Sequence, residues 1–134
     1  MKKIILFSAL LLSSSVNATV TASSSSEIPS GCRAYHHCDI PGHHNIEVTN
    51  DSAIPKSYGY IYSLCIMRMQ TETDCQYVHN VITLQPYQHW VNHHESMIRP
   101  RLSDKGKYTY RVLTSIDGAE KSIDDKRYIV ELGD

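Results

Sequence analysis

The sequence predicts an all-β domain built as a sandwich of antiparallel strands. Residues 107–116 alternate apolar and polar side chains, which is the period of a half-buried strand. Segments rich in turn-forming residues separate this run from several similar ones. No segment of ten or more residues shows the 3.6-residue hydrophobic period of a helix. We therefore expect about seven strands in one domain.

Residues 1–18 have the pattern of a secretory signal peptide. Lys2 and Lys3 precede an apolar run from Ile4 to Leu12, and small residues end the segment at Ala18. A run of about nine apolar residues is too short to cross a bilayer as a helix. Cleavage after Ala18 would leave 116 of the 134 residues, the size of one domain. We expect an exported protein, periplasmic or extracellular and bacterial, with no membrane span.

The segment after the signal peptide is dominated by Ser and Thr. Residues 19–31 include the block Ser23 to Ser26 and offer little apolar surface to offset the entropy of ordering the chain. We expect a flexible leader over residues 19–31 and a single β-sandwich domain over residues 32–134.

The strand candidates follow in order along this domain. They cover residues 46–50, 58–69, 77–84, 107–116 and 127–132. The second and third should form a hairpin around residues 70–74. The charged run Asp124 to Arg127 is interpreted as a solvated turn before the last strand.

Four cysteines lie in the exported part of the chain, where an even number indicates disulfides. Four cysteines allow three pairings. The predicted hairpin places Cys65 opposite Cys75, so we favour Cys65–Cys75 together with Cys32–Cys38.

The charge of the chain excludes one class of partner. Loss of Lys2 and Lys3 with the signal peptide takes the net charge from −1 to −3. Such a chain has no basic field to attract nucleic acid or anionic lipid. We expect no nucleic-acid partner.

The residues Asp104-Lys105-Gly106-Lys107-Tyr108 resemble the Asp-x-Gly-x-Tyr signature of immunoglobulin-like sandwiches. In that superfamily the tyrosine forms a corner by bonding its hydroxyl to backbone upstream, and this resemblance implies a structural role for Tyr108. Tyr110 stands where antibody-type domains have their second core cysteine. The resemblance therefore implies an immunoglobulin-like or fibronectin-like sandwich without a disulfide between the sheets.

Eight His residues are an excess for a chain of 134 residues, and most are clustered. Imidazole is a common ligand for zinc and copper, and His-rich tracts bind such metals. If the chain binds Zn²⁺ or Cu²⁺, we expect the ligands to be His36, His37, His43 and His44, which lie within nine positions. The alternative is solvated surface histidine, because neighbouring residues on an extended chain point to opposite sides.

Nine Tyr residues accompany a single Phe and a single Trp. Tyrosine is enriched in recognition surfaces, so Tyr58, Tyr60 and Tyr62 could form a binding stripe. Burial is the favoured interpretation, because Leu64 and Ile66 continue the same face. We expect the exposed aromatic contacts for a partner to come from turn-rich segments, at Tyr35, Tyr87 and Trp90.

The remaining motifs argue against catalysis. Met67 and Met69 offer soft thioether ligands for copper(I), but core packing beside Cys65 is the favoured interpretation. The chain lacks Gly-x-Ser-x-Gly, Ser-x-x-Lys and a glycine-rich phosphate loop. We expect an exported, non-enzymatic module that needs no cofactor and binds another macromolecule, a protein or a glycan. The alternative is a His-rich metal-binding or metal-carrier protein for zinc or copper.

Overall fold

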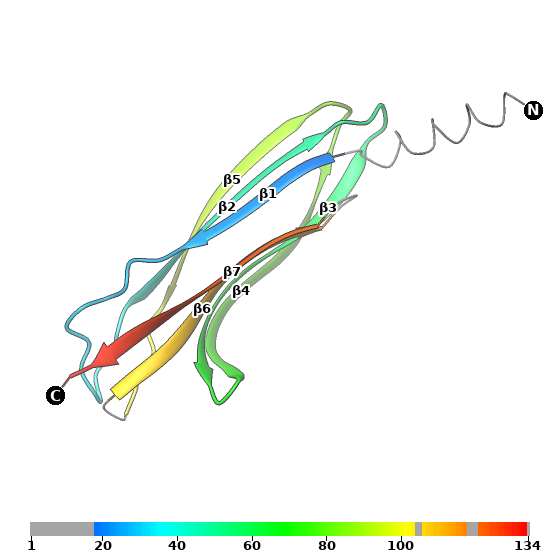
Figure 1. Cartoon of the computed structure of the whole chain (residues 1–134). Coiled ribbons are helices and arrows are strands. Elements are labelled where there is room, and N and C mark those ends of the chain that lie inside the picture. The colour runs from blue at the N-terminus through cyan, green and yellow to red at the C-terminus, as the bar shows by residue number, and fades with distance from the viewer. Residues whose placement is uncertain (1–17, 104–105, 118–120, 134) are drawn as a thin grey trace, which may run out of the picture.

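The computed structural model describes residues 18–103, 106–117 and 121–133, and these residues form seven strands (Figure 1). The strands are β1 (Ala18–Ser25), β2 (Ile40–Asn50), β3 (Lys56–Arg68), β4 (Thr71–Leu84), β5 (His89–Ile98), β6 (Gly106–Asp117) and β7 (Lys121–Leu132). One sheet has the order β1-β2-β5 and the other has the order β4-β3-β6-β7. All pairs are antiparallel, so the predicted all-β sandwich is confirmed.

β1 lies where we expected a flexible leader, so that prediction was wrong for residues 19–25, whereas residues 26–31 belong to no strand. All eight residues of β1 pair with β2. Ala18 is buried, and Ala22 packs against the core. The hydroxyl groups of Ser24 and Thr114 hydrogen bond at 2.7 Å inside the sandwich. Backbone pairing and these inward contacts offset the entropy of ordering a segment with few apolar side chains. The sandwich thus begins well before the expected domain boundary.

β3 and β4 form the predicted hairpin. Its loop is the pair Met69 and Gln70, with φ of 49° and 69°, as a two-residue turn that matches the twist of the strands requires. The predicted disulfide Cys65–Cys75 joins the two strands near this turn. Met69 is 98% exposed at the tip, so the expected core packing of this side chain was wrong. The reason is that the turn ends the strand alternation before Met69.

Besides β1, the strand β5 was absent from the predicted set, and β2, β4 and β7 begin several residues before their predicted starts. β2 begins at Ile40, and all ten residues of β5 pair with β2 although six of the ten side chains of β5 are polar. β7 begins at Lys121, so the run Asp124 to Arg127 is strand and not the expected turn. Asp124 accepts a hydrogen bond from the backbone N–H of Ser24 at 2.7 Å, which gives this acidic residue a partner within the sandwich.

The second predicted disulfide, Cys32–Cys38, closes the loop between β1 and β2. The backbone N–H of Cys38 donates to the Pro100 carbonyl at 3.0 Å, and that of Tyr35 donates to the Leu102 carbonyl at 2.7 Å. Two disulfides indicate an oxidising, exported environment. Among the residues that the structure describes, none belongs to a helix long and apolar enough to cross a membrane.

The core consists of two hydrophobic clusters, one toward each end of the sandwich. The first includes Leu64 and Val112, and the second includes Tyr58, Tyr60 and Tyr62. The favoured inward orientation of these three tyrosines is therefore confirmed. Each fully buried large side chain contributes about 1.5–3 kcal/mol to stability.

Candidate binding surfaces

The four histidines of the expected metal site do not converge. His36 and His37 lie exposed in the β1–β2 loop, where the His37 ring bonds to the Arg99 carbonyl oxygen at 3.0 Å. His43 and His44 are adjacent in β2, so their side chains point to opposite faces of the sheet. Within the described residues, the group of metal-ligating side chains that comes together is Cys65, Glu72 and Cys75, and its two cysteines form a disulfide.

His44 lies inside the sandwich and belongs to a buried polar band between the two hydrophobic clusters. Its Nε2 hydrogen bonds with the Ser96 hydroxyl at 2.7 Å, and its Nδ1 with the Thr114 hydroxyl at 2.9 Å. Burial, assisted by the nearby His94, lowers the pKa of His44 to about 4. The ring is therefore neutral at pH 7. The pair Ser96 and His44 has the distance of a nucleophile and its base, but both residues are buried, which favours a structural role.

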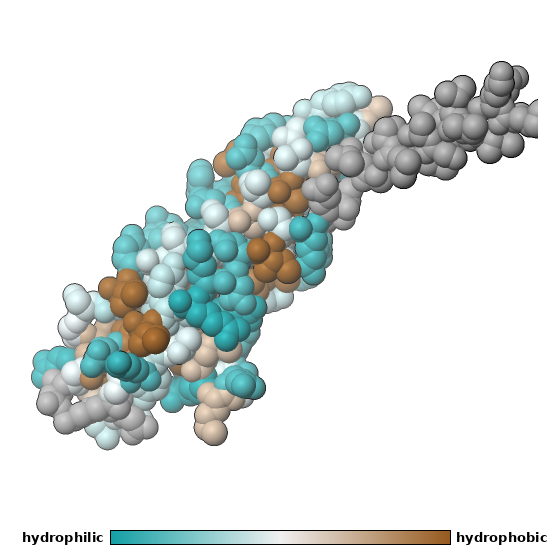
Figure 2. All heavy atoms as spheres, viewed as in Figure 1, coloured by the Kyte–Doolittle hydropathy of each residue, from teal (hydrophilic) through white to brown (hydrophobic). Residues whose placement is uncertain are grey.

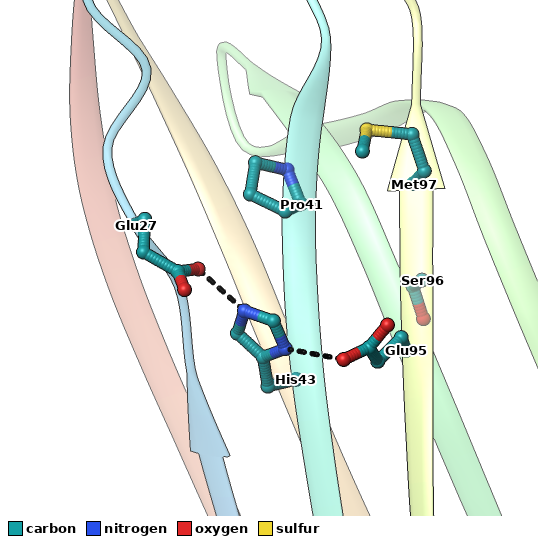
Figure 3. A pocket seen from close by; sticks show the side chains of 6 residues that line it. All are labelled: Glu27, Pro41, His43, Glu95, Ser96 and Met97. Atoms are coloured by element: carbon teal, nitrogen blue, oxygen red, sulfur yellow. Dashed lines mark hydrogen bonds and ion pairs between the residues drawn. The ribbon is translucent and has the colours of Figure 1, made fainter.

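His43 lies on the outer face of the three-stranded sheet, in a shallow pocket of about 450 Å³ (Figure 3). Glu27 approaches its Nε2, and Glu95 lies 3.8 Å from its Nδ1. The hydrogen bond from His43 lowers the pKa of Glu27. Figure 3 shows the two carboxylates on opposite sides of the ring. Glu27 links the imidazole to the segment after β1, and Glu95 links it to β5. The two carboxylates therefore do not converge on one point where an ion would bind.

The three aromatic residues expected to contact a partner lie apart from one another. Tyr35 is 62% exposed in the β1–β2 loop, beside the start of β2. Tyr87 is 67% exposed in the loop before β5, beside the end of β2. Trp90 is half-buried, with its ring 5.5 Å from that of Tyr60. The two exposed tyrosines thus lie at opposite ends of the sandwich and do not share one surface.

Five apolar side chains lie close together on the outer face of the four-stranded sheet, among polar and charged residues. Residues paired across antiparallel strands point to the same face. One row across the sheet contains Ile61 and Ile123, which are both aligned with Ser115. The next row contains Tyr77 and Leu113, which are both aligned with Ser63. With Val81 on β4, these residues form what we call the outer apolar face: Ile61, Tyr77, Val81, Leu113 and Ile123.

Several of these side chains are well exposed although they are apolar. Tyr77 is 59% exposed, Val81 58% and Ile123 53%. The part of the surface visible in Figure 2 is mostly hydrophilic, with hydrophobic residues in separate clusters. Exposed apolar side chains in adjacent rows of one sheet face are typical of an interaction site, although Ser63 and Ser115 lie between some of them here.

A charged cluster borders the outer apolar face. Arg111 pairs with Glu72 at 2.6 Å and with Asp125 at 2.9 Å. Burial disfavours the charged guanidinium, but the bonds to both carboxylates outweigh this effect, and the pKa of Arg111 is raised. Two ion pairs thus join the three side chains beside the apolar ones. Such a combination matches the apolar centre and polar rim of protein interfaces.

Tyr108 is half-buried against the first hydrophobic cluster, and the Arg68 guanidinium lies 5.5 Å from its ring centre. Asp104, the first residue of the immunoglobulin-like signature, lies outside the described residues. The corner role of Tyr108 stays a prediction.

The outer apolar face was not among the surfaces predicted from the sequence. The pattern that could have indicated it is the alternation in β4 and β7. Tyr77, Val81 and Ile123 occupy the alternate positions whose side chains point away from the core. Because the two faces of a strand look alike in sequence when both carry apolar residues, only the packing distinguishes them.

Comparison with solved structures gives a fold-level likeness. The chain is similar to part of Bacteroides uniformis beta-glucuronidase 2 bound covalently to cyclophellitol-6-carboxylate aziridine, with a TM-score of 0.52, 12% identity and 81% of this chain covered. A second Bacteroides uniformis beta-glucuronidase structure gives a TM-score of 0.50 and 13% identity over 81% of this chain. The chain spans 13% of each of those enzymes. This likeness shows a shared β-domain fold. No protein-family model matches the chain, and no curated protein sequence matches it.

Proposed function

We propose that this chain is an exported, non-enzymatic β-sandwich module that binds another protein through its outer apolar face. The observation that carries the proposal is the set of partly exposed apolar side chains in adjacent rows of the four-stranded sheet. Covering such a surface removes apolar area from water, which favours association. The two disulfides support export to an oxidising compartment, the periplasm or the extracellular space.

A protein partner fits this surface better than a glycan. The side chains offered to a ligand are mainly aliphatic, and Tyr77 is the single aromatic ring among them. Arg111, Glu72 and Asp125 beside them supply charges of both signs, which suit the polar rim of a protein interface. Tyr35 and Tyr87 remain candidates for separate, smaller contacts at the two ends of the sandwich.

The immunoglobulin-like assignment belongs to the same proposal. Seven strands in two sheets support it, with one difference from the constant-type arrangement, in which the fourth strand pairs with the fifth. Here β4 pairs with β3, because a two-residue turn connects them. If Tyr108 is the corner residue, Tyr108→Phe should lower the free energy of unfolding by about 1 kcal/mol in denaturant titrations. A variant as stable as the parent would remove the support that this residue gives.

The metal-carrier alternative has less support. His43 and His44 lie on opposite faces of β2, and both nitrogens of His44 already have hydrogen-bond partners. A metal at the four expected histidines would need the strand to rearrange.

Site-specific photo-crosslinking in the cells that make the protein tests the proposal. A photoreactive phenylalanine analogue at Ile123 probes the outer apolar face. The same analogue at Val91 is the matched control, since Val91 is 46% exposed on the outer face of the other sheet. We expect a discrete protein adduct from position 123 and none from position 91. No adduct from position 123, or the same adducts from both positions, would contradict the proposal.

A further inference from the structure

The sandwich has four edge strands, and three of them are protected. β1 and β7 cover one another: the Ser24 backbone N–H donates to Asp124, and Lys126 Nζ donates to the Ser24 carbonyl oxygen at 2.9 Å. At the edge of β5, the Met97 backbone N–H donates to the Gln76 side chain at 2.8 Å, and Glu95 adds a charge. Charged side chains and covered backbone groups are the usual means of preventing strand addition.

The fourth edge, β4, carries no charge over most of its length, and the one covered backbone group there is the Val81 N–H, which bonds to the Asn80 side chain. Glu72 and Asp74 carry charge only near the hairpin tip. From Cys75 to Leu84 there is no Lys, Arg, Asp, Glu or Pro. Most side chains of this stretch are exposed. A long, uncharged edge strand is a template for pairing with another strand.

The backbone of β4 shows which of its groups face the free edge. The Val81 N–H donates to the side-chain oxygen of its neighbour Asn80 at 2.8 Å, so we infer that this N–H points away from β3. In an antiparallel ladder every second residue turns its N–H and C=O to the same side. Tyr77, His79 and Val81 thus turn their backbone N–H and C=O groups toward the free edge. Before another strand pairs there, the Asn80 side chain accepts the hydrogen bond of the Val81 N–H.

We propose that the β4 edge pairs antiparallel with β4 of a second copy of this chain, with His79 at the two-fold axis. Tyr77 and Val81 lie two residues on either side of His79, so Tyr77 of each copy would face Val81 of the other. Aromatic and β-branched residues form favourable cross-strand pairs. No like charges meet within the uncharged stretch, which suits self-association.

This pairing would extend the four-stranded sheet of each copy into one eight-stranded sheet. Odd-numbered β4 residues of one copy would pair with odd-numbered β4 residues of the other. Paired residues point to the same face, so both outer apolar faces would lie on the same side of the joined sheet. The inference concerns the backbone groups at the edge of β4, whereas the proposed protein partner contacts side chains; Tyr77 and Val81 belong to both sites, so the crosslink at Ile123 tests the face separately.

A cysteine at the axis tests the register directly. Facing residues in a hydrogen-bonded antiparallel pair have Cα atoms about 5.5 Å apart, within the range that a disulfide spans. Under mild oxidation His79→Cys should form a covalent dimer at least about tenfold faster than the control Val91→Cys, which lies on the edge strand of the other sheet. Peptide mass mapping identifies the 79–79 bond against rearranged native disulfides. Equal rates for the two variants would overturn the proposal.

Self-association of the otherwise unmodified chain gives a second, independent readout. Val81→Pro removes the N–H that faces the free edge without removing a bond to β3, and proline is tolerated at strand edges. Val81→Thr keeps the N–H and the branched shape and serves as control. By sedimentation equilibrium we expect dimers for wild type and Val81→Thr, and at least about tenfold weaker association for Val81→Pro. A monomeric wild type at millimolar concentration, or equal association of all three forms, would contradict the inference.

Discussion

His44 holds together the polar band that divides the core. Its ring bonds to Ser96 and Thr114, the Thr114 hydroxyl bonds to Ser24, and Ser24 bonds to Asp124 on β7. Each hydrogen bond in this series joins one sheet to the other or a central strand to an edge strand. Buried polar groups that are fully paired in this way favour one register of the sheets over others, because a shifted register would leave them unpaired.

The neutral state of His44 makes stability depend on pH. The pKa of His44 is about 4 in the folded protein and 6.5 in the unfolded chain. Between pH 6.5 and 4 the unfolded chain therefore binds more protons than the folded protein does. Stability is therefore fully present above pH 6.5 and declines as pH falls toward 4, by up to about 3 kcal/mol in total. Unfolding free energies of wild type and His44→Gln measured from pH 7 to 4 check this. A difference between the two that does not change with pH would contradict the assignment.

At the scale of elements, strand patterns were predictable where one face is apolar. β3 and β6 were predicted almost to their ends, because their inward residues include large side chains such as Tyr62 and Val112. β1 was missed because its inward positions carry small or hydroxylated residues, Ala22 and Ser24, that resemble linker sequence. Such a strand is ordered by pairing with its neighbour, which a local pattern does not reveal.

The β3–β4 turn contains local strain that a substitution should relieve. Met69 and Gln70 both have positive φ, a conformation that costs most L-residues roughly 1–2 kcal/mol and that Asn-Gly adopts readily. We expect the double substitution Met69→Asn with Gln70→Gly to raise the free energy of unfolding by about 1 kcal/mol. Denaturant titration with circular dichroism detection measures the change. Unaltered or lower stability would show that the Met69 side chain itself stabilises the hairpin.

The Cys65–Cys75 disulfide of the same hairpin should change the free energy of unfolding by more than the turn substitution does. Replacing Cys65 and Cys75 by Ser releases a bridge that closes a separation of 10 residues, and we expect a loss of about 2–4 kcal/mol. The comparison is made by thermal and denaturant unfolding of the double variant against wild type. Thiol titration of the unfolded wild type should find no free thiol, because all four cysteines are paired.

At the scale of the whole molecule, the fold class and both disulfides followed from the sequence, but the location of the binding surface did not. The sequence directed attention to histidine clusters and to Tyr35, Tyr87 and Trp90, which the fold distributes over separate surfaces. The outer apolar face arises because four strands align residues that are far apart along the chain, such as Ile61 and Ile123. Such a surface depends on strand order, which alternation alone does not specify.

We assign the binding activity of the molecule to the outer apolar face. The most direct test of this assignment is the affinity of the partner captured at position 123 for two matched variants, measured by isothermal titration calorimetry. Ile123→Glu places a charge on the outer apolar face, and Val91→Glu places the same charge on the opposite sheet. We expect at least about tenfold weaker binding for Ile123→Glu and an unchanged Kd for Val91→Glu. Equal affinities for both variants would contradict the assignment.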